Sequence, residues 1–125
     1  MRLDHLHVFC RSLEPSIVFL AEAFGAKIAE RRLMGGKPGA VLELDGLNIF
    51  LKETGEGTAL PNWSAETCGC DHLGFVVDDL EATLKTLCAR KDTRLTREPF
   101  RAGKRMCAFV AGPDDLSVEL MQQME

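Results

Sequence analysis

The sequence predicts an α+β fold made of two βαβββ modules that form a curved mixed sheet, and three observations support this expectation. The segment LDHLHVFCRSLEPSI, residues 3–17, matches CDHLGFVVDDLEATL, residues 70–84, with a constant shift of 67 (72 − 5). Both copies are followed by the same order of strand patterns, and one parity of every strand is apolar. A repeated unit of this size packs against its copy. We therefore expect one domain made of module 1–53, linker 54–69 and module 70–125.

The first module reads as one strand, one helix and three further strands. Residues 2–10 alternate in the manner of a strand, with His5 and His7 on the same side. Ser12 is a candidate helix N-cap, and apolar residues recur at helical spacing up to Gly25, a residue typical of helix ends. An Asp-Gly dipeptide makes the last two strands a hairpin. The three strands are expected at 26–34, 40–45 and 47–53.

The second module repeats this order after a polar segment. Residues 54–69 are rich in Gly, Thr and Ser and contain Trp63, the one tryptophan, so we expect them to form a linker. A strand is expected at 70–77 and a helix at 80–89, with Asp79 as the N-cap of that helix. The remaining strands are expected at 94–100, 104–111 and 116–123.

Composition and charge exclude several classes of protein. Apolar residues make up 46% of the chain and charged residues 27%, and no apolar run is long enough to cross a bilayer, so we expect a soluble protein without a membrane span. The net charge of −4 and the lack of a basic cluster argue against nucleic-acid binding. Five cysteines without a secretion signal predict free thiols and a cytoplasmic location.

Strand parity places three candidate metal ligands on the side of the sheets that faces away from the helices. His5 and His72 occupy the same position in the two copies, so pseudo-twofold packing would bring both rings to one place. Glu119 lies on the same parity of the last strand, beside the first strand of its own module. Two imidazoles and one carboxylate form a ligand set for a divalent ion, with positions left open for water or substrate. The alternative is two core histidines and a rim carboxylate in a metal-free binding fold.

The sequence resembles the vicinal oxygen chelate superfamily, which includes glyoxalase I, fosfomycin-resistance enzymes, methylmalonyl-CoA epimerases, extradiol dioxygenases and bleomycin-binding proteins. The resemblance rests on the DHLxxxxxxLE start of each module, on the ending AFVAGPDDLSVELM and on the doubled βαβββ order. It implies the glyoxalase/bleomycin-resistance/dioxygenase fold for the whole chain. In this resemblance His5 matches the first metal ligand of the family, His72 the histidine of the second module and Glu119 the glutamate of the last strand.

The position of a fourth ligand or base in glyoxalase I and the epimerases is occupied here by Phe50, which cannot ligate a metal. The remaining three ligands are similar to those of fosfomycin-modifying enzymes and extradiol dioxygenases. Two further residues are candidates for catalysis by proton transfer: His7, on the parity of His5, and Glu43, the best substitute for the missing carboxylate. The simpler interpretation is a polar residue on the cavity wall for His7 and a solvated strand residue for Glu43.

We therefore expect a metal-dependent enzyme, a glyoxalase-like lyase or isomerase acting on a small substrate. Its divalent ion (Ni, Zn, Mn, Co or Fe) would hold two neighbouring oxygens and act as a Lewis acid on a developing enolate or alkoxide. The alternatives are a metal-free drug-binding or resistance protein, an extradiol-type dioxygenase and a fosfomycin-type transferase. The resemblance also implies a homodimer, because short chains of the family often complete sites or sheets across a subunit interface. Basic residues that would meet an anionic part of the substrate, or simply be exposed on the sheet, are Arg31, Arg32, Lys104 and Arg105.

Overall fold

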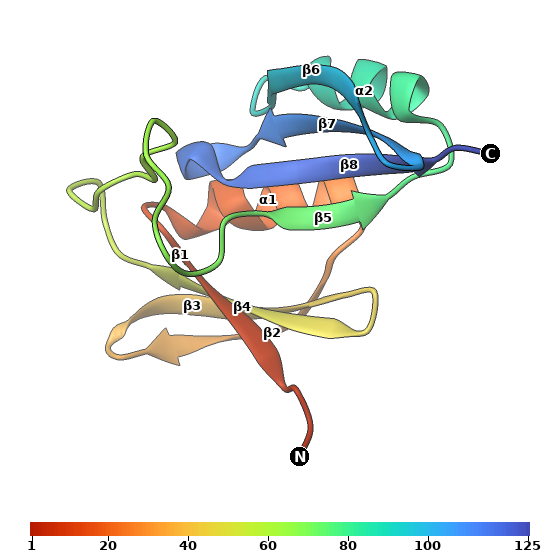
Figure 1. Cartoon of the computed structure of the whole chain (residues 1–125). Helices are drawn as coiled ribbons and strands as arrows, with labels where there is room; N and C mark the ends of the chain where they lie inside the picture. Colours follow the sequence, from red (N-terminus) through yellow and green to blue (C-terminus); the bar gives the residue numbers. More distant parts are fainter. The chain divides into compact units, whose positions relative to one another are not determined.

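Each half of the chain folds as one strand, one helix and three further strands, in the order that the repeat predicts (Figure 1). The computed structural model describes residues 1–125, which form two compact units, Met1–Ala59 (unit 1) and Leu60–Glu125 (unit 2). Unit 1 contains β1 (His5–Cys10), α1 (Leu13–Phe24), β2 (Lys27–Met34), β3 (Lys37–Leu44) and β4 (Leu47–Glu53). Unit 2 contains β5 (Leu73–Val76), α2 (Leu80–Cys88), β6 (Arg94–Ala102), β7 (Arg105–Ala111), the 3-10 turn η1 (Pro113–Asp115) and β8 (Ser117–Gln123).

The strands of each unit form one four-stranded mixed sheet. The strand orders are β1-β4-β3-β2 and β5-β8-β7-β6. In both sheets the first strand runs parallel to the last one, and the other neighbours are antiparallel. His7 lies opposite Phe50 in unit 1, as Gly74 lies opposite Glu119 in unit 2. The prediction that Phe50 stands where the second module has Glu119 is thereby confirmed.

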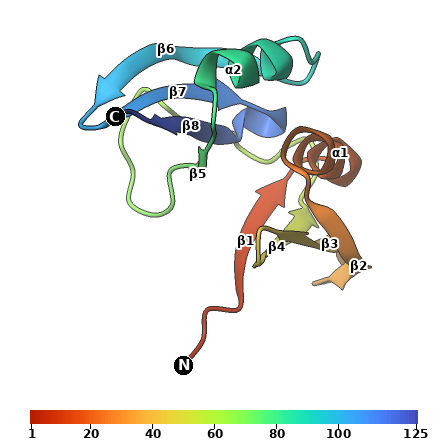
Figure 2. The same cartoon turned by 90° about the vertical axis from the view of Figure 1, so that its right-hand side faces the viewer.

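One face of each sheet packs against the helix of its own unit, as Figures 1 and 2 show for α2 over the second sheet. The side chains between this face and the helix form the core. Those that are almost fully buried include Phe19 and Leu20 of α1 with Leu42, Ile49 and Leu51 of the sheet in unit 1, and Val110, Val118 and Leu120 in unit 2. Each such burial contributes about 1.5–3 kcal/mol. The opposite parity forms what we call the open face of each sheet. The open face of unit 1 includes His5, His7, Phe9, Val41, Glu43, Asn48, Phe50 and Lys52, and that of unit 2 includes Arg94, Arg97, Phe100, Arg105, Cys107, Phe109, Glu119 and Met121.

The two helices begin with different hydrogen bonds. Oδ1 of Asp79 accepts from the backbone N–H of Ala82 at 3.0 Å, so the predicted cap of α2 is confirmed. Ser12 has the extended backbone of an N-cap, but its hydroxyl makes no capping hydrogen bond. The N–H of Leu13 donates instead to Oε2 of Glu53, at the end of β4, at 2.9 Å. The prediction for Ser12 is therefore right about the helix start and wrong about the group that stabilises it.

The first strand of unit 2 is shorter than predicted. The expected strand at 70–77 is reduced to Leu73–Val76, so His72 directly precedes the strand, whereas His5 is the first residue of β1. Gly69 has a φ of +117°, a conformation that favours glycine and turns the chain before it enters the sheet. Because His72 lies outside the strand, its ring is positioned by its side-chain contacts with Asp71 and Glu119 as much as by the backbone hydrogen bonds of the sheet.

Candidate functional site

The best-defined polar pair of unit 2 is formed by His72 and Glu119. Nε2 of His72 lies 2.9 Å from Oε2 of Glu119, and Nδ1 of the same ring lies 2.8 Å from Oδ2 of Asp71. Gly74, opposite Glu119, leaves room for the side chain of Met121, because a Cβ at this position would lie 3.2 Å from Cε of Met121, whereas its distance of 4.0 Å from Oε2 of Glu119 would be an ordinary contact. The side chains of His72 and Glu119 are 29% and 18% exposed. The pair is therefore partly shielded and still open to a small molecule.

The carboxylates on both sides of the ring control the protonation of His72. Burial by itself lowers the pKa of His72, but the hydrogen bonds to Asp71 and Glu119, with their negative charges, outweigh burial and hold the pKa above its ordinary value. An imidazolium donates from both ring nitrogens, and each of the two carboxylates accepts one of these hydrogen bonds. The positively charged form of His72 is thus favoured at this point of the open face.

Two phenyl rings and a thiol adjoin this pair. Phe109 meets His72 edge to face, with ring centroids 5.0 Å apart and planes at 84°, and Phe100 lies parallel to Phe109 at 6.1 Å. Cys107 is buried on the same face. Burial and the nearby carboxylate of Glu119 raise the pKa of the Cys107 thiol. The thiol therefore stays protonated at neutral pH and is poorly suited to act as a nucleophile.

His5 is the counterpart of His72 in unit 1 and shares one of its two contacts. Nδ1 of His5 lies 2.8 Å from Oδ2 of the preceding residue, Asp4. The other contact differs, because the ring of Phe50 stacks on the His5 ring with centroids 3.7 Å apart and planes within 2° of parallel. A stacked ring covers the face of an imidazole and not its edge. Nε2 of His5 therefore remains available to a ligand in the plane of the ring.

His7 and Glu43, the two predicted acid–base residues, both lie on the open face of unit 1. The ring of His7 meets Phe50 edge to face, with centroids 6.0 Å apart, and lies 6.3 Å from the ring of His5. Glu43 is exposed and lies opposite Asn48, which in turn lies opposite His5. Two strand spacings of about 4.8 Å each therefore separate Glu43 from His5. His7 is the nearer of the two candidates to His5.

The three predicted ligands have a donor set that suits a divalent ion. Metal-binding histidines usually coordinate through one nitrogen while the other donates to a carboxylate or carbonyl, and His5 and His72 both have this second contact. The 2.9 Å between Nε2 of His72 and Oε2 of Glu119 is close to the separation of two neighbouring ligands that each lie about 2.1 Å from one ion. Neither unit alone gathers three His, Cys, Asp or Glu side chains into a metal-binding group. The convergence of His5 with the other two ligands stays a prediction, because His5 belongs to the other unit.

Asp4 and Asp71 contact the two histidines, and neither aspartate was predicted as a site residue from the sequence. Both aspartates belong to the repeat, since 4 + 67 = 71, and both directly precede a candidate ligand. An Asp-His dipeptide in both copies is the signal that identifies them. It indicates that each histidine is fixed by its own neighbour before any metal binds.

Comparison with known proteins identifies the family of this chain. The sequence model of the Glyoxalase/Bleomycin resistance protein/Dioxygenase superfamily matches residues 2–120. No sequence among curated proteins matches the chain significantly. No helix of the structure is long and apolar enough to cross a membrane.

Several solved structures share the fold. The glyoxylase/bleomycin resistance protein/dioxygenase domain from Frankia sp. EAN1pec is 24% identical, with a TM-score of 0.79, and the match covers 100% of this chain and 93% of that chain. A mutant of the fosfomycin resistance protein FosX from Listeria monocytogenes, complexed with Mn(II) and a dihydroxypropylphosphonic acid, is 17% identical, with a TM-score of 0.73, and the match covers 95% and 87%. The trypanothione-dependent glyoxalase I of Leishmania major is 20% identical, with a TM-score of 0.73, and the match covers 98% and 86%. On the match over residues 2–120, the chain belongs to the Glyoxalase/Bleomycin resistance protein/Dioxygenase superfamily.

Proposed function

We propose that this protein is a metal-dependent enzyme of its superfamily, a glyoxalase-like lyase or isomerase that acts on a small substrate through two neighbouring oxygens. The ligands are His5, His72 and Glu119. The observation that supports this proposal most is the pair of Asp-His contacts, because each one leaves Nε2 of its histidine for coordination. When bound, a divalent ion supplies Lewis-acid polarisation to the substrate oxygens.

The side chains around the site have separate roles in this proposal. Asp4 and Asp71 hold a proton at Nδ1 of each histidine and so fix the orientation of the ring. Phe50 supports the face of His5. Proton transfer to or from the substrate is assigned to His7 first, because it lies on the strand of His5, and to Glu43 second. A group of this kind typically contributes about 10²–10⁴-fold in rate.

The solved relatives agree with the proposal at the level of the superfamily. The FosX mutant was determined with Mn(II), and another relative is a glyoxalase I. Both are less than 25% identical to this chain, so the choice among lyase, isomerase, dioxygenase and transferase rests on assay. A homodimer that completes the site across two copies belongs to the same proposal.

The second candidate function is a metal-free protein that binds a small molecule or drug. The stacking of His5 on Phe50 favours it, because a histidine clamped on a phenyl ring also makes a flat apolar surface for a ligand. Unlike the first proposal, this function does not need Nε2 of either histidine.

Elemental analysis of protein purified without chelators separates the two candidates. The enzyme proposal predicts a stoichiometric divalent ion in the native protein and its loss in both His5→Ala and His72→Ala. Protein without Ni, Zn, Mn, Co or Fe would favour the metal-free binder, and metal retained in either variant would show that the ligand assignment is wrong. Hemithioacetal, acyl-CoA, catechol and fosfomycin substrates, assayed with the loaded protein, then identify the reaction.

A further inference from the structure

We propose that Arg97 and Arg105, on the open face of unit 2, form a subsite for an oxyanion and hold the anionic end of the substrate beside His72 and Glu119. The proposal deepens the proposed function by naming a substrate class, and it rests on that function only for the reaction at the other end of the substrate. Its structural basis lies within unit 2 alone.

Residues that lie opposite one another across the strands of the open face form a row. The strand register places Arg97 in the same row as Glu119. Across the sheet, Gly74 lies opposite Glu119, Glu119 opposite Phe109, and Phe109 opposite Arg97. The next row contains Met121, Cys107 and Phe100, and Arg105 lies one row further on, opposite Gln123 and Ala102. Arg97 and Arg105 therefore flank the row of Cys107 from opposite sides.

The guanidinium groups of both arginines lean into that middle row. The guanidinium carbon of Arg97 lies 3.6 Å from the ring centroid of Phe100. Nη1 of Arg105 donates to Sδ of Met121 at 3.3 Å. Both arginines thus contact residues of the row of Cys107, Arg97 at Phe100 on β6 and Arg105 at Met121 on β8.

Neither arginine has an anionic partner. Arg97 contacts a phenyl ring, and Arg105 contacts the thioether of Met121 and the amide oxygen of Gln123. Two other arginines of unit 2 are paired with carboxylates: Nη1 of Arg94 lies 2.8 Å from Oδ1 of Asp115, and Nε of Arg90 lies 3.0 Å from Oδ1 of Asp92. The nearby carboxylate of Glu119 is already engaged by His72. Two forked donors without a countercharge, both in contact with residues of the row of Cys107, fit an oxygen anion.

The rings beneath Arg97 restrict its motion. Phe100 supports the guanidinium, and Phe109 lies parallel to Phe100 on the side of His72. A guanidinium stacked on an aromatic face loses less freedom when it binds, which favours affinity.

Same-face residues on one strand are about 6.8 Å apart, which sets the distance from the row of Glu119 to the row of Cys107. The fitting substrate is therefore a small carboxylate, phosphate or phosphonate whose reacting oxygens lie a few bonds from the anionic group.

The proposal is tested on chelator-treated protein, titrated separately with inorganic phosphate and with acetate. The Nε–Hε NMR signals of Arg97 and Arg105 report binding directly. We expect saturable shifts at both side chains with one or both anions, and the comparison of phosphate with acetate identifies the preferred oxyanion. Arg97→Gln and Arg105→Gln should each weaken binding by about tenfold or more, because a hydrogen bond to a charged group is lost.

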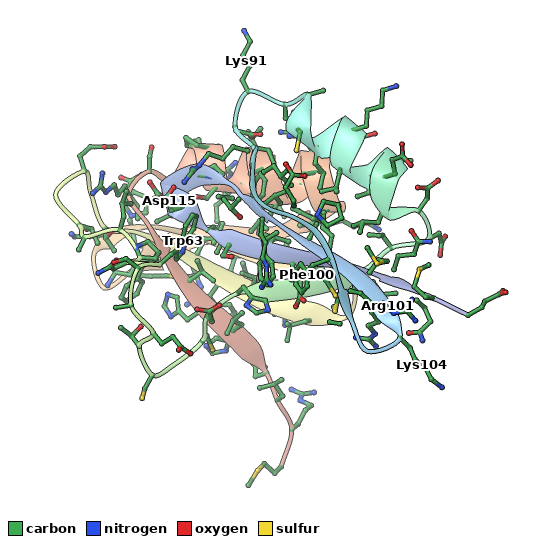
Figure 3. The ribbon with its side chains drawn as sticks, turned by 45° about the horizontal axis from the view of Figure 1, so that its top comes forward. Trp63, Lys91, Phe100, Arg101, Lys104 and Asp115 are labelled. Carbon is green, nitrogen blue, oxygen red and sulfur yellow. The ribbon has the colours of Figure 1, made fainter.

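The matched control is Arg101→Gln. Arg101 is an exposed arginine of the same strand whose register partner, Met106, lies on the other parity of β7, and its Nε donates to the carbonyl of Gly103. Figure 3 shows Arg101 near Lys104 at the β6–β7 turn, away from Trp63 and Asp115 at the opposite end of the sheet. Binding that survives Arg101→Gln and is lost in the other two variants supports the subsite.

Two results would overturn the subsite: no saturable shift with either anion, or an equal loss of binding in Arg101→Gln. The metal content of the same preparations, measured before chelation, keeps this outcome separate from the proposed function. Anion binding by a protein that never holds metal would reject the metal-dependent function and support the anion subsite. A protein that holds metal but binds neither anion would reject the subsite and leave the metal-dependent function unaffected.

Discussion

The two units differ at one position that decides what their histidines can do. His5 and His72 occupy equivalent places, and each is held at Nδ1 by the preceding aspartate. In unit 1 the last strand presents Phe50, which stacks flat on the imidazole, whereas in unit 2 it presents Glu119, whose carboxylate lies 2.9 Å from Nε2. The repeat has thus kept the sheet, the helix and the Asp-His pair while the facing residue has diverged. Unit 2 carries a charged pair, and unit 1 carries a histidine on an aromatic support.

The largest expected effect comes from substituting the two residues that differ between the units, Phe50 and Glu119, because both substitutions should change the affinity for a metal ion. Glu119→Phe should weaken the binding of Mn(II) or Co(II) by more than about 100-fold, the upper range for residues that only support a ligand. Phe50→Glu should tighten it by about tenfold, because it adds a charged donor beside His5. Isothermal titration of chelator-treated protein measures both, with Glu81→Gln on the exposed side of α2 as the control. Unchanged affinity in Glu119→Phe would contradict the assignment of this ligand.

Replacing the two aspartates tests whether both histidines are ligands. Asp4→Asn and Asp71→Asn should each weaken metal binding by about 10–100-fold. The carboxylate that fixes the orientation of the histidine ring and raises the basicity of its metal-binding nitrogen is then absent. The same titration measures the effect, and circular dichroism checks the fold. A loss confined to Asp71→Asn would mean that the metal is held without His5.

The charged pair of unit 2 also predicts a dependence of stability on pH in the metal-free protein. The pKa of His72 is raised, since hydrogen bonds to two carboxylates outweigh burial. Its contribution to stability is therefore fully present below the ordinary histidine pKa of about 6.5 and is lost as the pH rises through the higher pKa of the folded state. Urea unfolding at several pH values measures the trend, and NMR titration of the ring measures the pKa. Glu119→Gln should lower this pKa, and an unaltered pKa in that variant would contradict the pairing.

Substitutions at the N-termini of the two helices are expected to have the smallest effect, which is a change in the free energy of unfolding. Asp79→Ala removes a capping hydrogen bond and should cost about 1 kcal/mol of unfolding free energy. Ser12→Ala should cost less, because the Ser12 hydroxyl makes no such bond, while Glu53→Ala removes the acceptor of Leu13 N–H. Urea unfolding of the three variants measures the order. Equal losses for Ser12→Ala and Asp79→Ala would show that the helix starts are alike after all.

Much of the fold was predictable because the repeat and the strand parity both depend on local sequence. The alternation of side chains placed His5, Glu43 and Glu119 on the open faces, and the register confirms that Phe50 stands where the second module has Glu119. The contact of His72 with Glu119 agrees with the expectation that the last strand lies beside the first strand of its module. The capping of α1 by Glu53 was not predictable, because it joins residues that are far apart in the chain.

The arginine pair was missed because of irregular strand pairing. Arg97 and Phe100 are three residues apart, so simple alternation places them on opposite faces. The register shifts between them, which places Arg97 opposite Phe109 and Phe100 opposite Cys107 on the same face. A bulge of this kind adds a residue to one strand and reverses the parity beyond it. From the sequence, Arg105 was one of four basic residues expected to meet an anionic part of the substrate or simply to be exposed, and nothing joined it with Arg97.

Anomalous diffraction from crystals loaded with Mn(II) tests most directly whether two histidines far apart in the sequence share one ion with Glu119. We predict one peak in contact with Nε2 of His5, Nε2 of His72 and a carboxylate oxygen of Glu119, within one chain or between two copies of it. A peak on His72 and Glu119 with His5 elsewhere, or no peak at these residues, would contradict the account.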